Sequence, residues 1–289
     1  MYFILKLIAL IPLRILQTLA CWIAVILYSF DSSMKRITQI NIEIVYPELS
    51  KSEQQHLIKQ SLKSQCRTYV EFLKSWGMPP EYSLSLLKNI IGEQILTESL
   101  ENKKGVIVVV LHYGCWELLN SWLSLYTSPV IMYKPNKVKG FNRYILEARQ
   151  KYNATLVPTD ENGVRAIFKH LKQGGLTVIL PDHLPKISGG VYADFYGKNA
   201  LSSTLVSKLA AKTQCNILGV SCTRNTDLSS FDVHCRRLSE EILSKDTQQS
   251  VECLNQEIEK MINQDPVQYI WSYKRFRNIS GQVNVYNKT

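Results

Sequence analysis

The sequence of 289 residues contains no CxxC pair, no zinc-finger spacing, no internal repeat and no low-complexity segment. Its seven cysteines are odd in number and several lie in apolar runs, so we expect free thiols in a reducing compartment rather than a disulfide framework. Long runs of lysine and arginine are also missing. The 34 basic and 24 acidic residues nevertheless give a formal charge of +10, which favours an acidic partner such as nucleic acid, an acidic membrane surface or an acidic protein. Nucleic acid is the least supported of these, because the sequence lacks zinc-finger spacing and long basic runs.

A long unbroken apolar segment is also missing, because Pro12 and Arg14 interrupt the apolar N-terminus. Residues 15–30 carry little polarity, and at 1.5 Å per residue they reach or just miss the length that crosses a bilayer. No small-x-small cleavage site follows, which argues against a secretory signal. We therefore expect residues 1–30 to form an uncleaved membrane anchor that spans the bilayer or lies obliquely in one leaflet, and residues 31–289 to form a single domain.

The sequence GVIVVVLHYGCWE at residues 105–117 is the most informative part of the chain. Residues 106–111 are apolar and mostly β-branched, as in a strand that is buried on both faces of a parallel sheet. The run stops at His112, and open α/β sheets place their ligand crevices at such strand ends. Because Gly114 permits a turn, we predict that the Glu117 carboxylate orients one nitrogen of this imidazole and leaves the other free to accept a substrate proton.

The rest of the pattern predicts an α/β fold with a mixed, mostly parallel central sheet flanked by helices. A Ser52 capping pattern starts a predicted helix at 53–76, a second Leu-rich helix is predicted at 84–100, and the Gly-rich residues 182–202 are predicted to form an irregular loop over the site. Further strands are predicted at 129–133, 155–158, 176–180 and 217–222. Further helices are predicted at 117–126, 141–152, 163–173, 203–213 and 247–264.

The string GVIVVVLHYGCWELL resembles the first signature block of the bacterial lipid A secondary acyltransferases, the lauroyl and myristoyl transferase family, whose hallmark is a histidine, any four residues and an acid. This resemblance continues in order over nearly the whole chain. The later blocks are YKPN at 133–136, RYILEARQKYNATLVP at 143–158, VRAIFKHLKQGG at 164–175, LPDH at 180–183, GGVYADFYGKNA at 189–200 and PVQYIWSYKRFR at 266–277.

The resemblance implies transfer of a fatty acyl chain from acyl-acyl carrier protein to a hydroxyl of a Kdo-bearing lipid A precursor. It also implies a bacterial inner-membrane location, with the catalytic domain on the cytoplasmic side. His112 would be the general base, which contributes roughly 10²- to 10⁴-fold to the rate, and Glu117 would orient it. Backbone N–H groups near Gly114 or at the start of the following helix are candidates to stabilise the oxyanion. We expect no cofactor and no metal.

The resemblance also implies substrate-binding residues. Arg149 falls on the arginine that the family places beside a substrate phosphate, and Lys134 stands where many relatives carry arginine. Asp182 follows another predicted strand at the same edge of the sheet as the histidine, where it would orient a substrate group, tether the Gly-rich loop or cap it. Gly189 and Gly190 are expected to line the acyl or sugar site, since glycine allows close approach of the backbone.

Three other interpretations remain open at this point. An acyltransferase of this kind could act on a glycerophospholipid or another lipid alcohol. Alternatively, His112, Glu117 and His183 could bind a metal in a hydrolase, and His183 stands where the family commonly carries glutamine. The third interpretation is a membrane-surface lipid-binding protein without catalysis. Cys115, which stands where asparagine is usual, is a weak candidate nucleophile because no separate base accompanies it.

Overall fold

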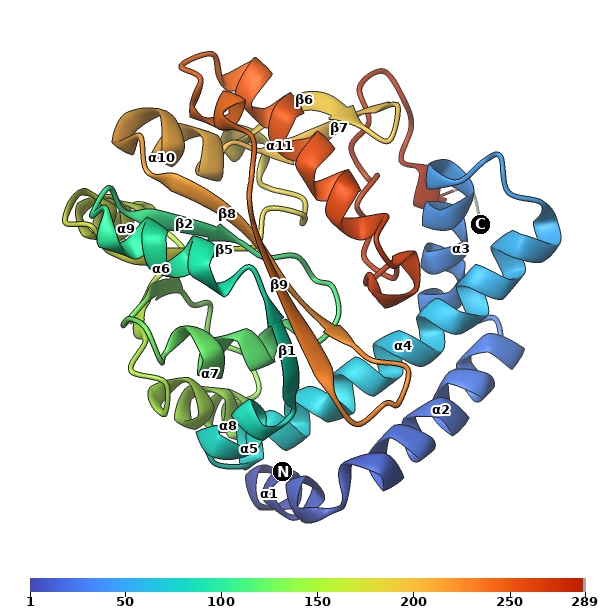
Figure 1. Ribbon diagram of the computed structural model, residues 1–289. Helices are drawn as coiled ribbons and strands as arrows, with labels where there is room; N and C mark the ends of the chain where they lie inside the picture. Colours follow the sequence, from blue (N-terminus) through green and yellow to red (C-terminus); the bar gives the residue numbers. More distant parts are fainter. Residues whose placement is uncertain (288–289) are drawn as a thin grey trace.

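A computed structural model describes residues 1–287 of the chain. Its centre is a sheet in the order β1-β9-β8-β2-β5-β3-β4, in which β8 and β9 pair antiparallel and all other neighbours pair parallel (Figure 1). The prediction of a mixed, mostly parallel sheet is therefore confirmed. The strands are β1 (Leu87–Ile91), β2 (Val106–Val109), β3 (Val130–Met132), β4 (Thr155–Val157), β5 (Leu176–Ile179), β8 (Asn216–Arg224) and β9 (Phe231–Arg237).

Strand β2 is fully buried and divides the hydrophobic core into two layers. Val106 and Val108 pack in one layer, which includes Leu96 and Trp122. Alternate β2 side chains pack in the other layer, to which helices on the opposite face contribute. This double burial explains why the strand is apolar at every position. The helices of the first layer include α6 (Glu93–Glu101) and α7 (Leu119–Leu123), and those of the second include α9 (Glu161–Lys172), α10 (Leu205–Thr213) and α11 (Thr247–Ile262).

The long helix α4 (Lys51–Gly77) connects the N-terminal helices to the sheet domain. Its prediction is confirmed, although the capping box is formed by Ser50 and Glu53 and not by Ser52. Helices α1 (Tyr2–Leu10), α2 (Leu13–Ser29) and α3 (Ser33–Val45) all contact α4. Figure 1 shows α2 running beside α4 along one side of the molecule.

Within residues 1–287, no single helix has both the length and the apolar character needed to cross a membrane. Helices α1 and α2 meet these requirements together, but the chain bends by 113° between them. Pro12 lies at the bend. Because proline has no backbone N–H, it cannot donate the hydrogen bond that would continue α1.

Two predictions about secondary structure are wrong. Residues 84–100 are not one helix, because Gly92 adopts a left-handed φ of 81° and separates β1 from α6. Residues 182–202 are not irregular throughout, because β6 (Gly190–Phe195) and β7 (Lys198–Ser203) pair as an antiparallel hairpin. Tyr196 and Gly197 both have positive φ in its two-residue turn, as such hairpins require.

The remaining predicted elements are confirmed with small shifts at their ends. The segment predicted as a helix at 117–126 forms the short 3₁₀ turn η1 (Trp116–Leu118) followed by α7. Strand β9 was not predicted. The other elements are α5 (Pro80–Ser85), α8 (Lys139–Gln150), η2 (Ile187–Gly189), η3 (Glu240–Leu243), η4 (Pro266–Gln268) and η5 (Val285–Asn287).

Candidate active site

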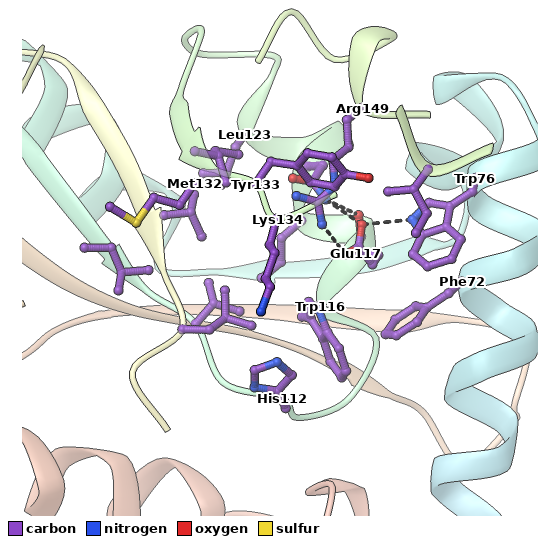
Figure 2. A pocket seen from close by; sticks show the side chains of 18 of the residues that line it. Phe72, Trp76, His112, Trp116, Glu117, Leu123, Met132, Tyr133, Lys134 and Arg149 are labelled. Atoms are coloured by element: carbon purple, nitrogen blue, oxygen red, sulfur yellow. Dashed lines mark hydrogen bonds and ion pairs between the residues drawn. The ribbon is translucent and has the colours of Figure 1, made fainter. Parts of the chain in front are cut away.

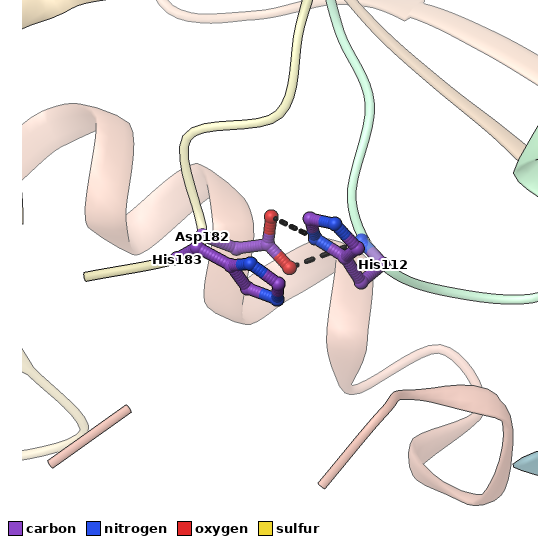
Figure 3. A group of neighbouring side chains, drawn as sticks. All are labelled: His112, Asp182 and His183. Atoms are coloured by element: carbon purple, nitrogen blue, oxygen red, sulfur yellow. Dashed lines mark hydrogen bonds and ion pairs between the residues drawn. The ribbon is translucent and has the colours of Figure 1, made fainter. Parts of the chain in front are cut away.

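The register of β2 and β5 brings His112 and Asp182 together. These strands are parallel neighbours with Val109 opposite Ile179, so the residues that follow each strand emerge at the same edge of the sheet. The Nδ1 atom of His112 lies 2.9 Å from Oδ1 of Asp182, and the backbone N–H of His112 donates to Oδ2 at 3.0 Å (Figure 3). The carboxylate therefore holds both the imidazole ring and the backbone of the histidine.

The Asp182 side chain is completely buried. Burial by itself raises the pKa of a carboxyl group, but the charge of His112 and its two hydrogen bonds outweigh this effect and lower the pKa of Asp182 below its usual range. Asp182 is therefore a carboxylate at physiological pH. A carboxylate at Nδ1 selects the tautomer in which Nε2 can accept a proton, and it stabilises the imidazolium that results.

Two further aromatic rings extend the histidine into a stack. The ring centroids of His112 and His183 are 3.6 Å apart with planes inclined by 3°, and those of His183 and Tyr273 are 3.7 Å apart with planes inclined by 8°. The Tyr273 hydroxyl accepts a hydrogen bond from the backbone N–H of Leu184 at 3.1 Å, which ties the stack to the loop after β5. Burial and the nearby charge of His112 lower the pKa of His183 to about 4, so this ring is neutral at physiological pH.

The candidate ligand atoms of His112, Asp182 and His183 lie within 4.8 Å of one another, which raises the question of a metal site. The lone pair of an imidazole nitrogen lies in the plane of its ring. Because the two histidine rings are stacked in parallel planes, their lone pairs do not converge on one point between them. Both Asp182 oxygens are also occupied by His112. This arrangement does not support a metal site at these residues.

Glu117 does not contact the histidine as predicted. The chain turns at Gly114, where φ is +60° and a Cβ atom would lie 2.1 Å from the backbone oxygen of Cys222. It then enters η1, which directs the Glu117 carboxylate toward Trp76 and Arg149 rather than toward His112 (Figure 2). The carboxylate that contacts Nδ1 of His112 is therefore that of Asp182 and not that of Glu117.

The Glu117 carboxylate lies at the centre of a buried polar group. Arg149 donates to Oε1 from Nη2 at 3.0 Å, Trp76 donates to Oε2 from Nε1 at 2.9 Å, and Asn120 donates to Oε2 at 3.1 Å. Glu117 is 6 % exposed, so loss of these donors would leave an uncompensated buried charge. Among the described residues, the buried Nε of Arg149 has no hydrogen-bond partner.

These groups line one cavity with a volume of about 480 Å³ (Figure 2). His112 lies at one side, and Glu117 and Arg149 lie at the other. Lys134 is an exposed residue beyond the end of β3, and its side chain extends into the cavity. Apolar side chains make up much of the remaining wall and include Leu119, Leu123, Ile131, Met132, Val178 and Ile179. The cavity thus combines a proton acceptor, two cations and a surface that suits a hydrocarbon chain.

The two predicted glycines lie outside this cavity. Gly189 lines a different groove between α9 and α10, and its carbonyl oxygen accepts hydrogen bonds from the backbone N–H and the hydroxyl of Thr204. Gly190 starts the β6–β7 hairpin, where a Cβ atom would lie 2.8 Å from the side chain of Pro185. The close approach of the backbone at Gly190 therefore serves the packing of the hairpin, whereas a Cβ atom at Gly189 would meet open space.

Two other sequence-based candidates are also excluded by their contacts. The backbone N–H of Gly114 donates to the Gln268 oxygen at 3.0 Å, and that of Cys115 donates to the Cys222 oxygen at 2.8 Å, so neither is available to an oxyanion. The Cys115 side chain is fully buried, and burial raises the pKa of its thiol. A thiol in this state is a poor nucleophile.

The aromatic residues of α4 were missed by the sequence analysis. Phe72 and Trp76 line the cavity, and Trp76 binds Glu117. Their signal in the sequence is weak, since an aromatic residue near the end of an amphipathic helix is typical of ordinary core packing. Trp116 is the third aromatic residue of this wall, with its ring centroid 5.0 Å from that of His112.

Comparisons with known proteins identify the family of this chain. Residues 1–278 match the model of the family described as bacterial lipid A biosynthesis acyltransferase. The chain is 24% identical over 271 residues to the lipid A biosynthesis palmitoleoyltransferase of Escherichia coli K12, with 92% of this chain and 86% of the relative covered. It is 20% identical over 275 residues to the lauroyltransferase of the same strain, with 95% and 89% covered. It is 19% identical over 288 residues to a lipid A biosynthesis acyltransferase of Haemophilus influenzae, with 99% and 89% covered. The chain therefore belongs to the bacterial lipid A biosynthesis acyltransferase family and is an acyltransferase.

Proposed function

We propose that this protein transfers a fatty acyl chain from acyl-acyl carrier protein to a hydroxyl of a Kdo-bearing lipid A precursor. The observation that carries the proposal is the His112–Asp182 pair, which lies at the side of an apolar cavity that also contains Arg149 and Lys134. The pair suits removal of a hydroxyl proton, the apolar wall suits the acyl chain, and the cations suit an anionic acceptor. Membership of the family supports this choice of donor and acceptor.

His112 acts as the general base in the proposed reaction. Its Nε2 accepts the proton of the acceptor hydroxyl while the hydroxyl oxygen forms a bond to the thioester carbonyl carbon. The tetrahedral intermediate then expels the thiolate, which takes the proton from the imidazolium and leaves as the thiol. Asp182 stabilises the imidazolium between these two steps, and no acyl-enzyme is formed.

The Glu117–Arg149 pair has a positioning function in this proposal. Glu117 fixes the guanidinium through a 3.0 Å contact, and Arg149 directs its remaining donors at an anionic group of the acceptor. Guanidinium suits this task because its planar fork matches phosphate. Lys134 adds a single charge that it can carry to several positions, since its side chain is exposed and flexible.

The proposed reaction takes place at the cytoplasmic face of the inner membrane. The outward side of α1 and α2 exposes large apolar side chains, whereas such groups are scattered elsewhere on the described chain. A contiguous exposed apolar surface of this kind is typical of a membrane-binding face. It comprises Met1, Phe3, Ile4, Leu7, Leu10, Ile15, Leu19, Trp22, Ile23, Val25, Ile26 and Phe30.

The function is tested with detergent-purified protein, acyl-acyl carrier protein and a Kdo-bearing tetraacyl lipid A precursor. We expect a product heavier by one acyl chain in the mass spectrum. The variant His112→Ala is expected to lose roughly 10²- to 10⁴-fold in kcat, while the matched variant His56→Ala, on the exposed side of α4, retains activity.

Two results would contradict the proposal. Rapid acylation of lysophosphatidate without acylation of the lipid A precursor would assign the protein to glycerophospholipid metabolism. Full activity of a folded His112→Ala variant in cells would instead support a membrane-surface lipid-binding protein.

A further inference from the structure

A second depression lies between α9 and α10, outside the catalytic cavity, and has a volume of about 540 Å³. Val164 and Phe168 of α9 form one wall, and Leu205 and Leu209 of α10 form the other. Phe168 is only half-buried, so the groove presents apolar surface to solvent. We call this depression the α9–α10 groove. An apolar groove between two surface helices has the shape that accepts a third helix.

The α9–α10 groove has a basic rim. Lys208 and Lys212 lie four residues apart on α10, so both project from the same face of the helix, and Arg165 lies on α9 across the groove. Neither lysine has an ion-pair partner among residues 1–287. Arg165 makes a weak, largely exposed contact of 3.6 Å with Glu161, which also lines the groove, so this acid offsets part of the charge of the three basic residues. The rim therefore retains unneutralised positive charge.

The groove adjoins the catalytic cavity. Leu205, the first residue of α10, lines both depressions. Ser188 and Gly189 line the groove and belong to the same segment after β5 that carries Asp182 and His183. The groove and the cavity thus share Leu205 as a wall residue.

The groove also lies away from the proposed membrane-binding face. Figure 1 shows α9 and α10 at the upper left of the molecule, α2 at the lower right and α1 at the bottom. If α1 and α2 contact the membrane, the α9–α10 groove faces the aqueous phase. A water-soluble partner would reach this surface without competing with the lipid.

From these observations we propose that the α9–α10 groove is the docking site for the donor's carrier protein. An acidic helix of the carrier lies against the apolar walls, its carboxylates contact Lys208, Lys212 and Arg165, and its acyl thioester enters the catalytic cavity past Leu205. This inference rests on the proposed function, because it takes the donor to be an acyl-acyl carrier protein. The charge of the rim is what favours an acidic partner over a neutral one.

The test compares two donors that carry the same acyl chain. One is acyl-acyl carrier protein, and the other is acyl-pantetheine, which has the same thioester but no protein. The double variant Lys208→Glu/Lys212→Glu is expected to raise KM for the carrier-bound donor about tenfold or more and to weaken the dependence of KM on salt. Both kcat and KM for acyl-pantetheine should stay unchanged. Direct binding of the carrier protein to the detergent-purified enzyme should weaken by a similar factor.

Two controls accompany this variant. Lys208→Arg/Lys212→Arg keeps the charge and should behave as the unaltered protein. Lys88→Glu reverses the charge of one lysine on β1, an edge strand remote from α9 and α10, and should leave both donors unaffected.

The outcomes are distinct. Equal loss with both donors would overturn the docking site and indicate that the groove holds the acyl chain or supports the fold. No loss with either donor would also overturn it, as would a change in oligomeric state that accounts for the loss. If the unaltered protein fails to use acyl-acyl carrier protein at all, the proposed function itself is wrong.

Discussion

Gln17 of α2 donates a 2.8 Å hydrogen bond to Oε1 of Glu71, a buried residue of α4. The same carboxylate accepts hydrogen bonds from Nε and Nη2 of Arg224, at the end of β8, at 2.5 and 2.6 Å. One buried ionic group therefore links the apolar N-terminal helix to the central sheet. Lys74 adds to this attachment by donating to the backbone oxygens of Ala9 and Ile11. Because α2 would have to leave these partners to cross a bilayer, the membrane-binding face proposed above would place α1 and α2 along the surface of one leaflet.

The first prediction concerns the stability that this ionic group provides. Glu71→Leu leaves the buried Arg224 guanidinium without its counter-ion, so we expect a loss of about 3 to 5 kcal/mol. The measurement is the midpoint of thermal unfolding in detergent, which should fall markedly. Adding Arg224→Met to Glu71→Leu should recover most of the loss, because it removes the unpaired charge. A single variant as stable as the unaltered protein would show that the pair is not what holds α2 in place.

The second prediction concerns the apolar face of α1 and α2. The triple variant Leu19→Ser/Trp22→Ser/Ile26→Ser removes three outward-facing side chains that are each more than half exposed. We expect its partitioning onto anionic vesicles to fall at least about a hundredfold, because each inserted side chain contributes about 1 kcal/mol or more. Flotation of the protein with the vesicles measures the effect.

A matched control tests whether vesicle binding depends on where the exposed apolar side chains lie or only on how many the protein has. Ile91→Ser/Leu125→Ser/Val283→Ser removes three exposed apolar side chains from other parts of the surface and should float like the unaltered protein. An equal loss of flotation in both triple variants would remove the argument for a specific membrane-binding face.

The third prediction separates the two carboxylates of the candidate site. Asp182→Asn removes the group that holds Nδ1 of His112, so we expect kcat to fall by about 10²- to 10⁴-fold and the acid limb of the pH–rate profile to shift. Glu117→Gln loosens Arg149 instead, so the main expected effect is a higher KM for the lipid acceptor with an unchanged pH profile. Steady-state kinetics from pH 5 to 9 measure both effects. The division of roles would be wrong if Glu117→Gln altered the pH profile while Asp182→Asn altered only KM.

The sheet could be predicted because its central strands carry a strong local signal. A strand such as β2, covered on both faces, must be apolar throughout, and residues 106–111 show this directly. Strand β1 carries no such signal, since it is an edge strand that includes the exposed residues Lys88 and Asn89. Its partner β9 lies far along the chain, so the pairing that makes residues 87–91 a strand is not visible in the local sequence.

Several residues of the candidate cavity were named from the sequence, but their contacts were not all predicted. His112 and Asp182 were expected at one edge of the sheet, but the contact between them depends on the pairing of β2 with β5, which a single sequence does not reveal. Proximity along the chain favoured Glu117 as the partner of the histidine. The 3₁₀ turn η1 instead presents that carboxylate to Trp76 of α4, a contact determined only by tertiary packing.

The fourth prediction concerns the dependence of stability on pH. The pKa of His183 is about 4 in the folded protein, below the value of about 6.5 for an unfolded chain. Between these pH values the unfolded chain binds a proton at this residue and the folded chain does not. Stability must therefore decline as the pH falls from about 6.5 toward 4, by at most about 1.4 kcal/mol per pH unit from this residue.

His183→Gln removes this titrating group while keeping a polar side chain of similar length. Between pH 7.5 and 5.0 we expect the variant to lose about 1 to 2 kcal/mol less than the unaltered protein, measured from thermal unfolding at each pH. His56→Gln, at an exposed position on α4, should leave the pH dependence as it is in the unaltered protein. If His183→Gln had the same pH dependence as the unaltered protein, the half-buried ring would not be excluding a proton. The stack of His112, His183 and Tyr273 would then tolerate a charge at its centre.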